Sequence, residues 1–460
     1  MVSFGALKWG GTSVGTPAAL DLARAETLRY HQELLKKDSD ATTIVVVSGT
    51  GKQKDSPVSE KNTDLLEQIV RGENVDRNVL EIKRREDRNA SHYGLPQDFN
   101  AQNYQLLERY ITDTNADTNL RYSRIVAIAG ELLKRRQFAA ILNLLQPDVA
   151  VEVNEKESGF YTTGGHIKAS IAEITNEKIR EAFSNPKYRG KIAVVAGFCG
   201  IDNGTGEIST LARGGSDASV LKYCEALGIR EVPIYSDTML RVADPAVVHY
   251  PETIREATYG EVAEFLGYGA SIVAPEALDI AERNLIKLLL RDTFHLSSGE
   301  TAVSVRGSNG KGNIKGIAAC DNLVLSLGNL HLEPGEYSRV TDALKRYGIG
   351  FTAEAGDNRH SSLVPLDSSN GSFGVNLGHV VEEIRNSGLS FELKNATRIG
   401  LIGEGIETQP RALTALGQTF EALGLRLGTI TKPENGIALS ITTDKTYKGR
   451  VVNDLYSRLF

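Results

Sequence analysis

Two glycine-rich segments carry the residues best suited to chemistry. The first, Lys8–Ser13, reads Lys-Trp-Gly-Gly-Thr-Ser and follows a short apolar stretch. Paired glycines let the backbone approach a ligand closely, and the free N–H groups at a helix start suit a phosphate. Lys8, Gly10 and Gly11 therefore form a candidate phosphate site. Taken alone, the segment is explained equally well by a glycine turn with a solvated lysine.

The second segment, Thr210–Asp217, reads Thr-Leu-Ala-Arg-Gly-Gly-Ser-Asp. A helix N-cap at Ser216 or Asp217 explains the hydroxyl and the acid, but not the paired glycines or Arg213. The planar fork of an arginine suits a carboxylate. A lysine for phosphate and an arginine for carboxylate, with an acid between them, indicate kinase chemistry on a carboxylate.

Two other glycine motifs resemble known catalytic or phosphate-binding motifs but lack residues that those motifs require. Gly11–Gly15 matches the G-x-S-x-G nucleophile elbow, but it follows the first expected strand, and none of the histidines lies in a motif that would make it a partner. Ser48–Lys52 resembles the end of a P-loop, but the opening glycine is missing and Gln53 stands where Ser or Thr would hold magnesium. The sequence therefore predicts neither a hydrolase elbow nor a Walker motif.

The elements that position these segments alternate between strand-like and helix-like over the first 300 residues, as in a parallel α/β sheet. Strands are expected at Leu7–Trp9, Ile44–Val47, Ile192–Gly197 and Val232–Tyr235, and helices at Pro17–Leu34, Ala127–Leu144, Asp217–Leu227 and Tyr259–Gly267. Ligands of open α/β sheets bind beyond the carboxyl ends of the strands, where the glycine clusters fall. The Lys8 corner and the Arg213–Asp217 corner are thus expected to converge on one cleft.

The expected units of strands and helices become shorter after a glycine-rich linker at Gly307–Gly312. Domains are expected over residues 1–300 and 301–460, the latter with two βαββα units at about 317–390 and 397–460. The second unit is expected to contain strands Arg398–Ile402, Leu425–Thr431 and Ile437–Thr442 and helices Pro410–Leu423 and Tyr447–Leu459. Because that unit lacks a closing strand, we hypothesise that Ile314–Ala319 supplies one.

Composition narrows the class of protein. The chain has 460 residues, 41% of them hydrophobic, and a net charge of −6, which is typical of a globular protein rather than a disordered one. The sequence has no basic stripe of the kind that binds nucleic acid, so a nucleic-acid partner is not expected. No apolar run reaches the roughly 20 residues that span a bilayer. No signal peptide is evident, and three widely spaced cysteines indicate a cytosolic protein without a disulfide scaffold or zinc site.

Taken together, the motifs resemble those of the aspartokinases of the amino-acid kinase family. The resemblance rests on Lys8–Ser13, Gly130-Glu131, Gly197-Phe198 and Leu211–Asp217 in this order, and it covers essentially the whole chain. It implies an amino-acid kinase fold, an α/β fold with a mostly parallel sheet sandwiched by helices, followed by two ferredoxin-like βαββαβ ACT domains. It further implies that ATP, with Mg²⁺, phosphorylates the side-chain carboxylate of L-aspartate, for lysine and threonine biosynthesis.

The resemblance also implies roles for individual residues. Lys8 would stabilise the transferring phosphoryl group, and Asp217 would organise the centre; no protein metal site is implied. The nucleotide would contact Lys8, Gly10, Gly11, Ser236 and Asp237. Aspartate would contact Ser48, Thr63, Glu131, Arg213 and Ser216, with Arg213 on its α-carboxylate and Glu131 on its α-ammonium. An amino-acid effector would bind the ACT domains, and the chain would form at least a homodimer.

The nucleotide half departs from the family pattern. Ser236–Ala246 is one residue shorter and lacks the family's glycine, tyrosine and final arginine, and Ser271 replaces a lysine that supports the ATP phosphates. We hypothesise that another cation substitutes for that lysine, although a solvated loop explains the lysines equally well; the candidates are Lys52, Lys54, Lys61 and Arg241. Three interpretations stay open: an aspartokinase under feedback control, a kinase for a related amino acid, and a non-catalytic amino-acid sensor.

Overall fold

The structure is a computed structural model, and it describes most of the chain. The described residues are 3–53, 58–113, 115–305, 314–327, 339–340, 342–344, 346, 351–354, 362–365, 373–387, 391–427, 430 and 435–460. They form two compact units. The first holds Met1–Leu240, Arg255–Tyr259 and Ser271–Arg306, and the second holds Arg241–Ile254, Gly260–Ala270 and Gly307–Phe460.

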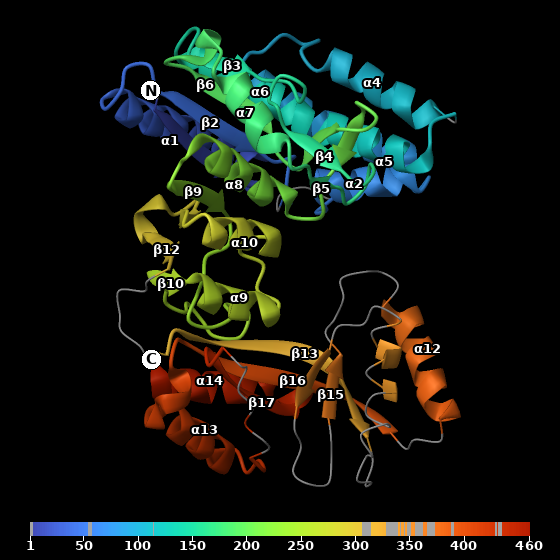
Figure 1. Ribbon diagram of the computed structural model, residues 1–460, viewed down its shortest axis with the longest axis vertical. Coiled ribbons are helices and arrows are strands. Elements are labelled where there is room, and N and C mark those ends of the chain that lie inside the picture. The colour runs from blue at the N-terminus through green and yellow to red at the C-terminus, as the bar shows by residue number, and fades with distance from the viewer. Residues whose placement is uncertain are drawn as a thin grey trace. The chain divides into compact units, whose positions relative to one another are not determined.

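The first unit is built on an eight-stranded sheet in the order β10-β12-β11-β9-β1-β2-β6-β3. Figure 1 labels β2, β3, β6, β9, β10 and β12 of this sheet. Its strands in that order are Glu256–Thr258, Glu300–Ser304, Lys287–Asp292, Glu231–Ser236, Phe4–Trp9, Thr42–Val47, Ile192–Ala196 and Ala150–Glu152. All neighbouring strands are parallel except the antiparallel pair β11 and β12. The mostly parallel sheet expected from the sequence is therefore confirmed.

The described part of the first 300 residues contains ten α-helices, of which all but α9 belong to the first unit. They are α1 (Pro17–Leu35), α2 (Asn62–Val70), α3 (Val75–His92), α4 (Ala101–Thr112), α5 (Thr118–Ala127), α6 (Leu133–Leu145), α7 (Thr175–Phe183), α8 (Gly215–Leu227), α9 (Tyr259–Gly267) and α10 (Pro275–Arg283). A single π-helical turn, Ile128–Leu132, joins α5 to α6 and contains Gly130 and Glu131. The helix expected over Ala127–Leu144 is thus interrupted at its Gly-Glu step.

Side-chain alternation along β1 decides which residues face the site. Leu7 and Trp9 pack in one apolar cluster with side chains of α1 and α6, such as Leu20 and Phe138. Because neighbouring residues of a strand point to opposite faces, Lys8 points to the other face, where α8 contacts β1. The period of the strand therefore directs a buried lysine toward the start of α8.

A second, smaller sheet belongs to the same unit. It has the order β5-β4-β7-β8, with strands Ser170–Ile171, Tyr161–Thr163, Cys199–Asp202 and Ile208–Thr210. The segment Leu211–Gly214 leads from β8 directly into α8. This small sheet thereby places the Arg213 loop at the start of α8.

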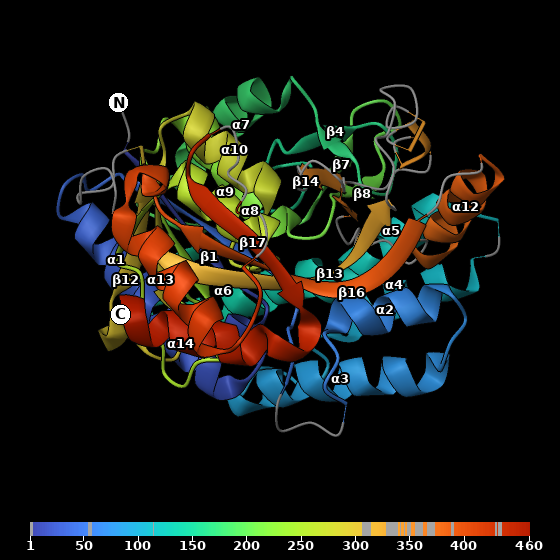
Figure 2. The ribbon, with the colours of Figure 1, turned by 90° about the horizontal axis from the view of Figure 1, so that it is seen from below.

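The second unit contains a five-stranded antiparallel sheet in the order β14-β15-β13-β16-β17. Its strands in that order are Phe351–Glu354, Ser362–Pro365, Gly316–Leu327, Phe391–Ile402 and Ala438–Asp444. Figure 2 shows β13 and β16 as long strands side by side, and they pair along their whole length from Gly316–Ile402 to Leu327–Phe391. The beginning of β13 thus gives the second repeat the neighbouring strand that its own sequence lacked.

Helices α13 (Pro410–Ala422) and α14 (Lys448–Leu459) close the core of this sheet, and α12 (Phe373–Asn386) belongs to the first repeat. Leu416, Phe420 and Leu455 from α13 and α14 pack on Ile399 and Leu401 of β16. Tyr268, just beyond α9, hydrogen-bonds Ser440 of β17, which explains why Gly260–Ala270 clusters with this unit although the sequence placed it in the first domain.

Two expectations for this region have different outcomes. The strand expected over Leu425–Thr431 is wrong for its described residues, because 425–427 and 430 lie outside any strand. Arg426 and Leu427 are both exposed, so this segment lacks the alternating buried face by which a strand of this sheet would pack on the core. The linker Gly307–Gly312 lies outside the described residues.

Candidate active site

Lys8 and Asp217 meet at the centre of the first unit. Lys8 Nζ lies 2.7 Å from Asp217 Oδ1, and the two side chains are only 10% and 11% exposed. The other carboxylate oxygen, Oδ2, accepts a hydrogen bond from the backbone N–H of Ala274, just before α10. The two corners therefore meet at Lys8 and Asp217, as the sequence led us to expect for these two residues.

Glycines in the turns after β1 and β2 lie beside this ion pair. A Cβ on Gly11 would lie 2.4 Å from the carbonyl oxygen of Gly49, and one on Gly51 would lie 2.4 Å from the backbone nitrogen of Thr12. The Gly10 N–H donates to the carbonyl of Tyr235 at 2.9 Å. The turns after β1 and β2 are therefore in backbone contact, and a side chain at Gly11 or Gly51 would force them apart.

Glu131 presents a buried carboxylate to the turn after β2. Its Oε1 accepts a hydrogen bond from the Gly49 N–H at 3.1 Å, whereas its Oε2 is buried without a hydrogen-bond partner among the described residues. Burial raises the pKa of Glu131 to about 7, although backbone N–H groups that bind its carboxylate oppose the shift. A cationic ligand group at Oε2 would satisfy this oxygen and favour the ionised carboxylate.

Arg213 lies on the loop before α8 with an exposed side chain. Its Nη2 donates to Asp64 Oδ1 at 2.9 Å and to Glu67 Oε2 at 3.1 Å, and both acids belong to α2. Sequence reasoning missed these acids and Tyr122, whose hydroxyl donates to Glu67. The acids' spacing of three residues places them on one helix face, but nothing in the sequence links that face to Arg213.

The remaining expected substrate residues supply hydroxyl groups. Ser48 follows β2 and is partly buried, Thr63 lies in the first turn of α2, and Ser216 is buried in the first turn of α8. Gly197, after β6, packs so tightly that a Cβ would lie 2.7 Å from the Cβ of Ser216. These contacts place Ser216 beside the carboxyl end of β6.

Strand β9, whose carboxyl end the family resemblance expects to face the nucleotide, is followed by polar, exposed residues. Ser236 Oγ lies 3.5 Å from Asp237 Oδ1 and 3.1 Å from Thr238 Oγ1, and the Thr238 hydroxyl donates to the Ser271 carbonyl at 3.3 Å. The exposed Ser271 therefore lies next to the strand end expected to face the nucleotide.

The candidate substitutes for the missing lysine have different surroundings. Lys52 and Lys61 are exposed on the loop between β2 and α2, and Lys54 lies outside the described residues. Arg241 belongs to the second unit, where its Nη1 donates to the Thr253 hydroxyl at 2.8 Å. Its guanidinium therefore already has a partner of its own.

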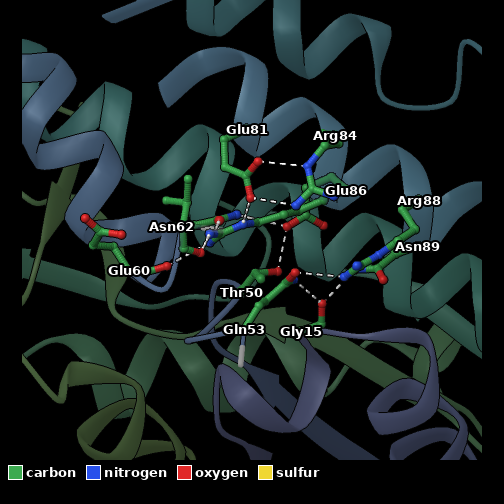
Figure 3. A network of polar contacts seen from close by, with 12 residues as sticks. Gly15, Thr50, Gln53, Glu60, Asn62, Glu81, Arg84, Glu86, Arg88 and Asn89 are labelled. Carbon is green, nitrogen blue, oxygen red and sulfur yellow. Dashed lines mark hydrogen bonds and ion pairs between the residues drawn. The ribbon is translucent and has the colours of Figure 1, made fainter. Parts of the chain in front are cut away.

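A buried polar network on α3 supports the glycine turns (Figure 3). Glu86 accepts hydrogen bonds from the Thr50 hydroxyl at 2.5 Å and from Asn62 at 3.0 Å, and its second oxygen pairs with Lys134 at 2.6 Å. Lys134 and Glu86 are 0% and 1% exposed. Arg85, also buried, donates to the carbonyls of Val58 and Glu60.

Gln53 extends this network to the turn after β1. Its amide donates to the Gly15 carbonyl at 2.7 Å and accepts from Arg88 at 2.8 Å (Figure 3). Helix α3 therefore holds both glycine turns through buried side chains. Sequence reasoning missed this network because charged residues on a helix are usually solvated.

Ser13 has a structural role. Its hydroxyl is buried and lies 2.6 Å from the hydroxyl of Thr293, which follows β11. It has no histidine partner among its hydrogen bonds in the described part of the chain. This geometry supports the rejection of a nucleophile elbow at Gly11–Gly15.

The arrangement can bind an anion beside Lys8 at the start of α8 and stabilise negative charge that develops there. Lys8 supplies a buried cation. Because glycines have no side chains, the backbone N–H groups of the glycine turns stay accessible to a ligand. Glu131 can pair with an ammonium group, and Arg213 can bind a carboxylate. The described residues contain no cluster of three or more His, Cys, Asp or Glu side chains that could hold a metal ion.

Comparisons with known proteins identify the family of the first unit. A model of the amino acid kinase family matches residues 6–292. An aspartokinase of Thermus thermophilus is 26% identical over 300 residues, which span 63% of this chain and 72% of the relative. Aspartokinase 1, chloroplastic, of Arabidopsis thaliana is 22% identical over 465 residues, or 99% of this chain and 80% of that protein.

Two crystal structures share the fold over nearly the full length of both chains. The aspartate kinase of Clostridium acetobutylicum has a TM-score of 0.78 at 20% identity and covers 99% of this chain and 100% of its own. Aspartokinase III of E. coli, in complex with aspartate and ADP, has a TM-score of 0.77 at 21% identity and covers 100% of each chain.

Proposed function

The chain belongs to the amino acid kinase family, and on this premise we propose that it transfers the γ-phosphoryl group of ATP to the side-chain carboxylate of L-aspartate. The observation that carries the proposal is the buried 2.7 Å ion pair of Lys8 and Asp217 at the carboxyl end of β1. The aspartokinases among the relatives and the aspartate and ADP bound to aspartokinase III of E. coli support it.

The proposed reaction needs no general base. A carboxylate with a pKa of about 3.9 is already ionised at neutral pH, so no proton has to leave before it attacks the γ-phosphorus. The site must align that carboxylate with the phosphorus and neutralise the charge on the phosphoryl oxygens. Lys8, held by Asp217, supplies the cation, and the N–H groups at the start of helix α8 supply dipoles.

Selectivity for an amino acid would come from the groups that bind its backbone atoms. Glu131 Oε2, which has no hydrogen-bond partner among the residues that the structure describes, is suited to the α-ammonium, and the exposed guanidinium of Arg213 is suited to the α-carboxylate. Ser48, Thr63 and Ser216 would donate to the carboxylates. A plain diacid lacks the ammonium group and would leave Glu131 unpaired.

Gly10, Gly11, Ser236 and Asp237 are the proposed nucleotide contacts. Mg²⁺ is usually held by one or two carboxylates together with the substrate phosphates, so it does not require a three-ligand protein site. The exposed Asp237 carboxylate at the end of β9 fits this limited role. The ion, when bound with ATP, would neutralise charge on the phosphates.

A second candidate function is supported by one observation. Ser271 lies beside β9 where the family resemblance expects a lysine, and a protein that senses amino acids without catalysis would tolerate that loss. The buried Lys8–Asp217 pair opposes this alternative because a sensor has no need for a desolvated cation at a phosphate site. A kinase for a related amino acid also fits Glu131 and Arg213, since neither reads the substrate's side chain.

Regulation and assembly are further parts of the proposal. We expect the region after residue 300 to contain two ACT domains that bind an amino-acid effector, as the lysine complex of aspartokinase III from E. coli suggests. We also expect at least a homodimer, which light scattering at micromolar concentration would test, and roles in lysine and threonine synthesis in the cytosol. No helix in the described ranges has the length and apolar character needed to cross a membrane.

A hydroxylamine trap tests the proposed function. Acyl phosphates react with hydroxylamine to give hydroxamates, whose iron(III) complexes are coloured, so the chain is incubated with ATP, Mg²⁺, hydroxylamine and each of the twenty amino acids. We expect a hydroxamate with L-aspartate alone. A product with a different amino acid would identify the divergent kinase, and no product at all would favour the sensor.

A further inference from the structure

Arg213 is already engaged by two carboxylates in this structure. Its Nη2 donates to Asp64 at 2.9 Å and to Glu67 at 3.1 Å, and these are its only hydrogen bonds to the described residues. Asp64 and Glu67 are one helical turn apart on α2, so both reach the same nitrogen. Their side chains are 27% and 21% exposed, whereas that of Arg213 is 69% exposed.

Glu67 is held in place from its other side. The Tyr122 hydroxyl, on α5, donates to Glu67 Oε1 at 3.0 Å. Burial, followed by the nearby Glu67 carboxylate, raises the pKa of Tyr122, so its hydroxyl keeps its proton at neutral pH. The carboxylate of Glu67 is therefore fixed while its second oxygen contacts Arg213.

The geometry of the Arg213 guanidinium limits how another carboxylate can bind while this contact is in place. Arginine offers a carboxylate two forks, one formed by Nη1 and Nη2 and the other by Nε and Nη2. Both forks include Nη2, and Asp64 and Glu67 occupy that nitrogen. A further carboxylate cannot bind Arg213 through two parallel hydrogen bonds until at least one of these contacts breaks.

We propose that Asp64 and Glu67 are specificity-determining residues that compete with the α-carboxylate of the substrate for Arg213. The inference rests on the proposed function, in which Arg213 binds that carboxylate. Exposed ion pairs are weak and exchange readily, so a well-placed substrate carboxylate can displace them. An amine or amide in the same position cannot do so, and Arg213 then stays on α2.

The test compares the KM for aspartate of the wild-type chain with that of Glu67→Gln. We expect the variant to lower this KM about two- to fivefold, with little change in kcat. Glu73→Gln is the matched control, because Glu73 is exposed and pairs with Arg71 rather than Arg213. An unchanged KM in Glu67→Gln would overturn the proposal, and a raised KM would mean that Glu67 orients Arg213 instead. Asp64→Asn repeats the test should Glu67→Gln fail to fold.

A second comparison separates competition for Arg213 from the general electrostatic effect of removing one negative charge near the substrate. Lysine has no fork, so in an Arg213→Lys background Glu67→Gln should no longer lower the KM for aspartate. β-Alanine lacks the α-carboxylate, so its inhibition constant should not change in Glu67→Gln. Equal gains in both backgrounds would overturn the proposal. A wild-type chain that forms no aspartyl hydroxamate would overturn the proposed function itself, which is a separate outcome.

Discussion

Lys8 Nζ lies 2.7 Å from Asp217 Oδ1, so the end of the first strand and the start of α8 meet at one buried ion pair. The pair follows from two local rules. Leu7 and Trp9 fill the core on the α1 and α6 side, which turns Lys8 to the opposite face. A positive φ at Gly214 lets the chain turn into α8, whose first turn contains Asp217.

The first prediction separates the catalytic and structural roles of this pair. We expect Lys8→Met to lower kcat at least about 100-fold, because a preorganised charge at the phosphoryl group is lost. It should also destabilise the fold by about 3 to 5 kcal/mol, since Asp217 is left as a buried charge. The double variant Lys8→Met/Asp217→Asn should recover most of the unfolding free energy in urea but none of the activity. Recovery of both would show that the pair is structural only.

The second prediction concerns the pH dependence of stability through Glu131. Its pKa in the folded state, about 7, lies above its ordinary value of 4.5, so the folded protein holds the proton more tightly than the unfolded chain. The stability that this group contributes is therefore fully present below pH 4.5 and is lost as the pH rises through 7. Compared with Glu131→Gln, the wild-type chain should lose about 3 kcal/mol of unfolding free energy across this window. Equal pH profiles for the two proteins would contradict the assignment.

The third prediction extends Glu131 to substrate binding. If its carboxylate pairs with the α-ammonium of aspartate, kcat/KM for aspartate should fall as the pH drops below 7, because the protonated acid no longer attracts a cation. Glu131→Gln should have a low kcat/KM without this break. The profile of Glu73→Gln, a change at an exposed acid, should match that of the wild-type chain. A break that survives in Glu131→Gln would assign it to another group.

The sequence was sufficient for the parts of the site that depend on local periodicity. The rule that ligands bind beyond the carboxyl ends of strands predicted that the Lys8 corner and the Arg213–Asp217 corner converge. The partners of Arg213 could not be predicted, because Asp64 and Glu67 are far from it in sequence and α2 reaches it only through tertiary packing. The π-helical turn at Glu131 was also missed, since its apolar spacing is close to that of an α-helix.

The fourth prediction concerns the buried network on α3. Lys134→Met removes the partner of a carboxylate that is 1% exposed, and we expect a loss of about 3 to 5 kcal/mol of unfolding free energy. Lys134→Met/Glu86→Gln should be more stable than Lys134→Met, because a neutral amide can still bind Thr50 and Asn62. An equal or lower midpoint in urea for the double variant would show that the two residues do not act as a pair.

The fifth prediction restores the missing cation on the nucleotide side. Ser271 is exposed, and its carbonyl accepts from Thr238 beside the end of β9, so a lysine side chain can replace it without displacing core residues. One preorganised donor is worth roughly 3 kcal/mol in the transition state, so Ser271→Lys should raise kcat/KM for ATP about 10- to 100-fold. Ser91→Lys, the same change on an exposed position of α3, controls for net charge. If Ser271→Lys leaves ATP use unchanged while Lys52→Ala or Lys61→Ala weakens it, another cation has already taken this role. If none of these variants alters ATP use, the nucleotide does not bind beside β9.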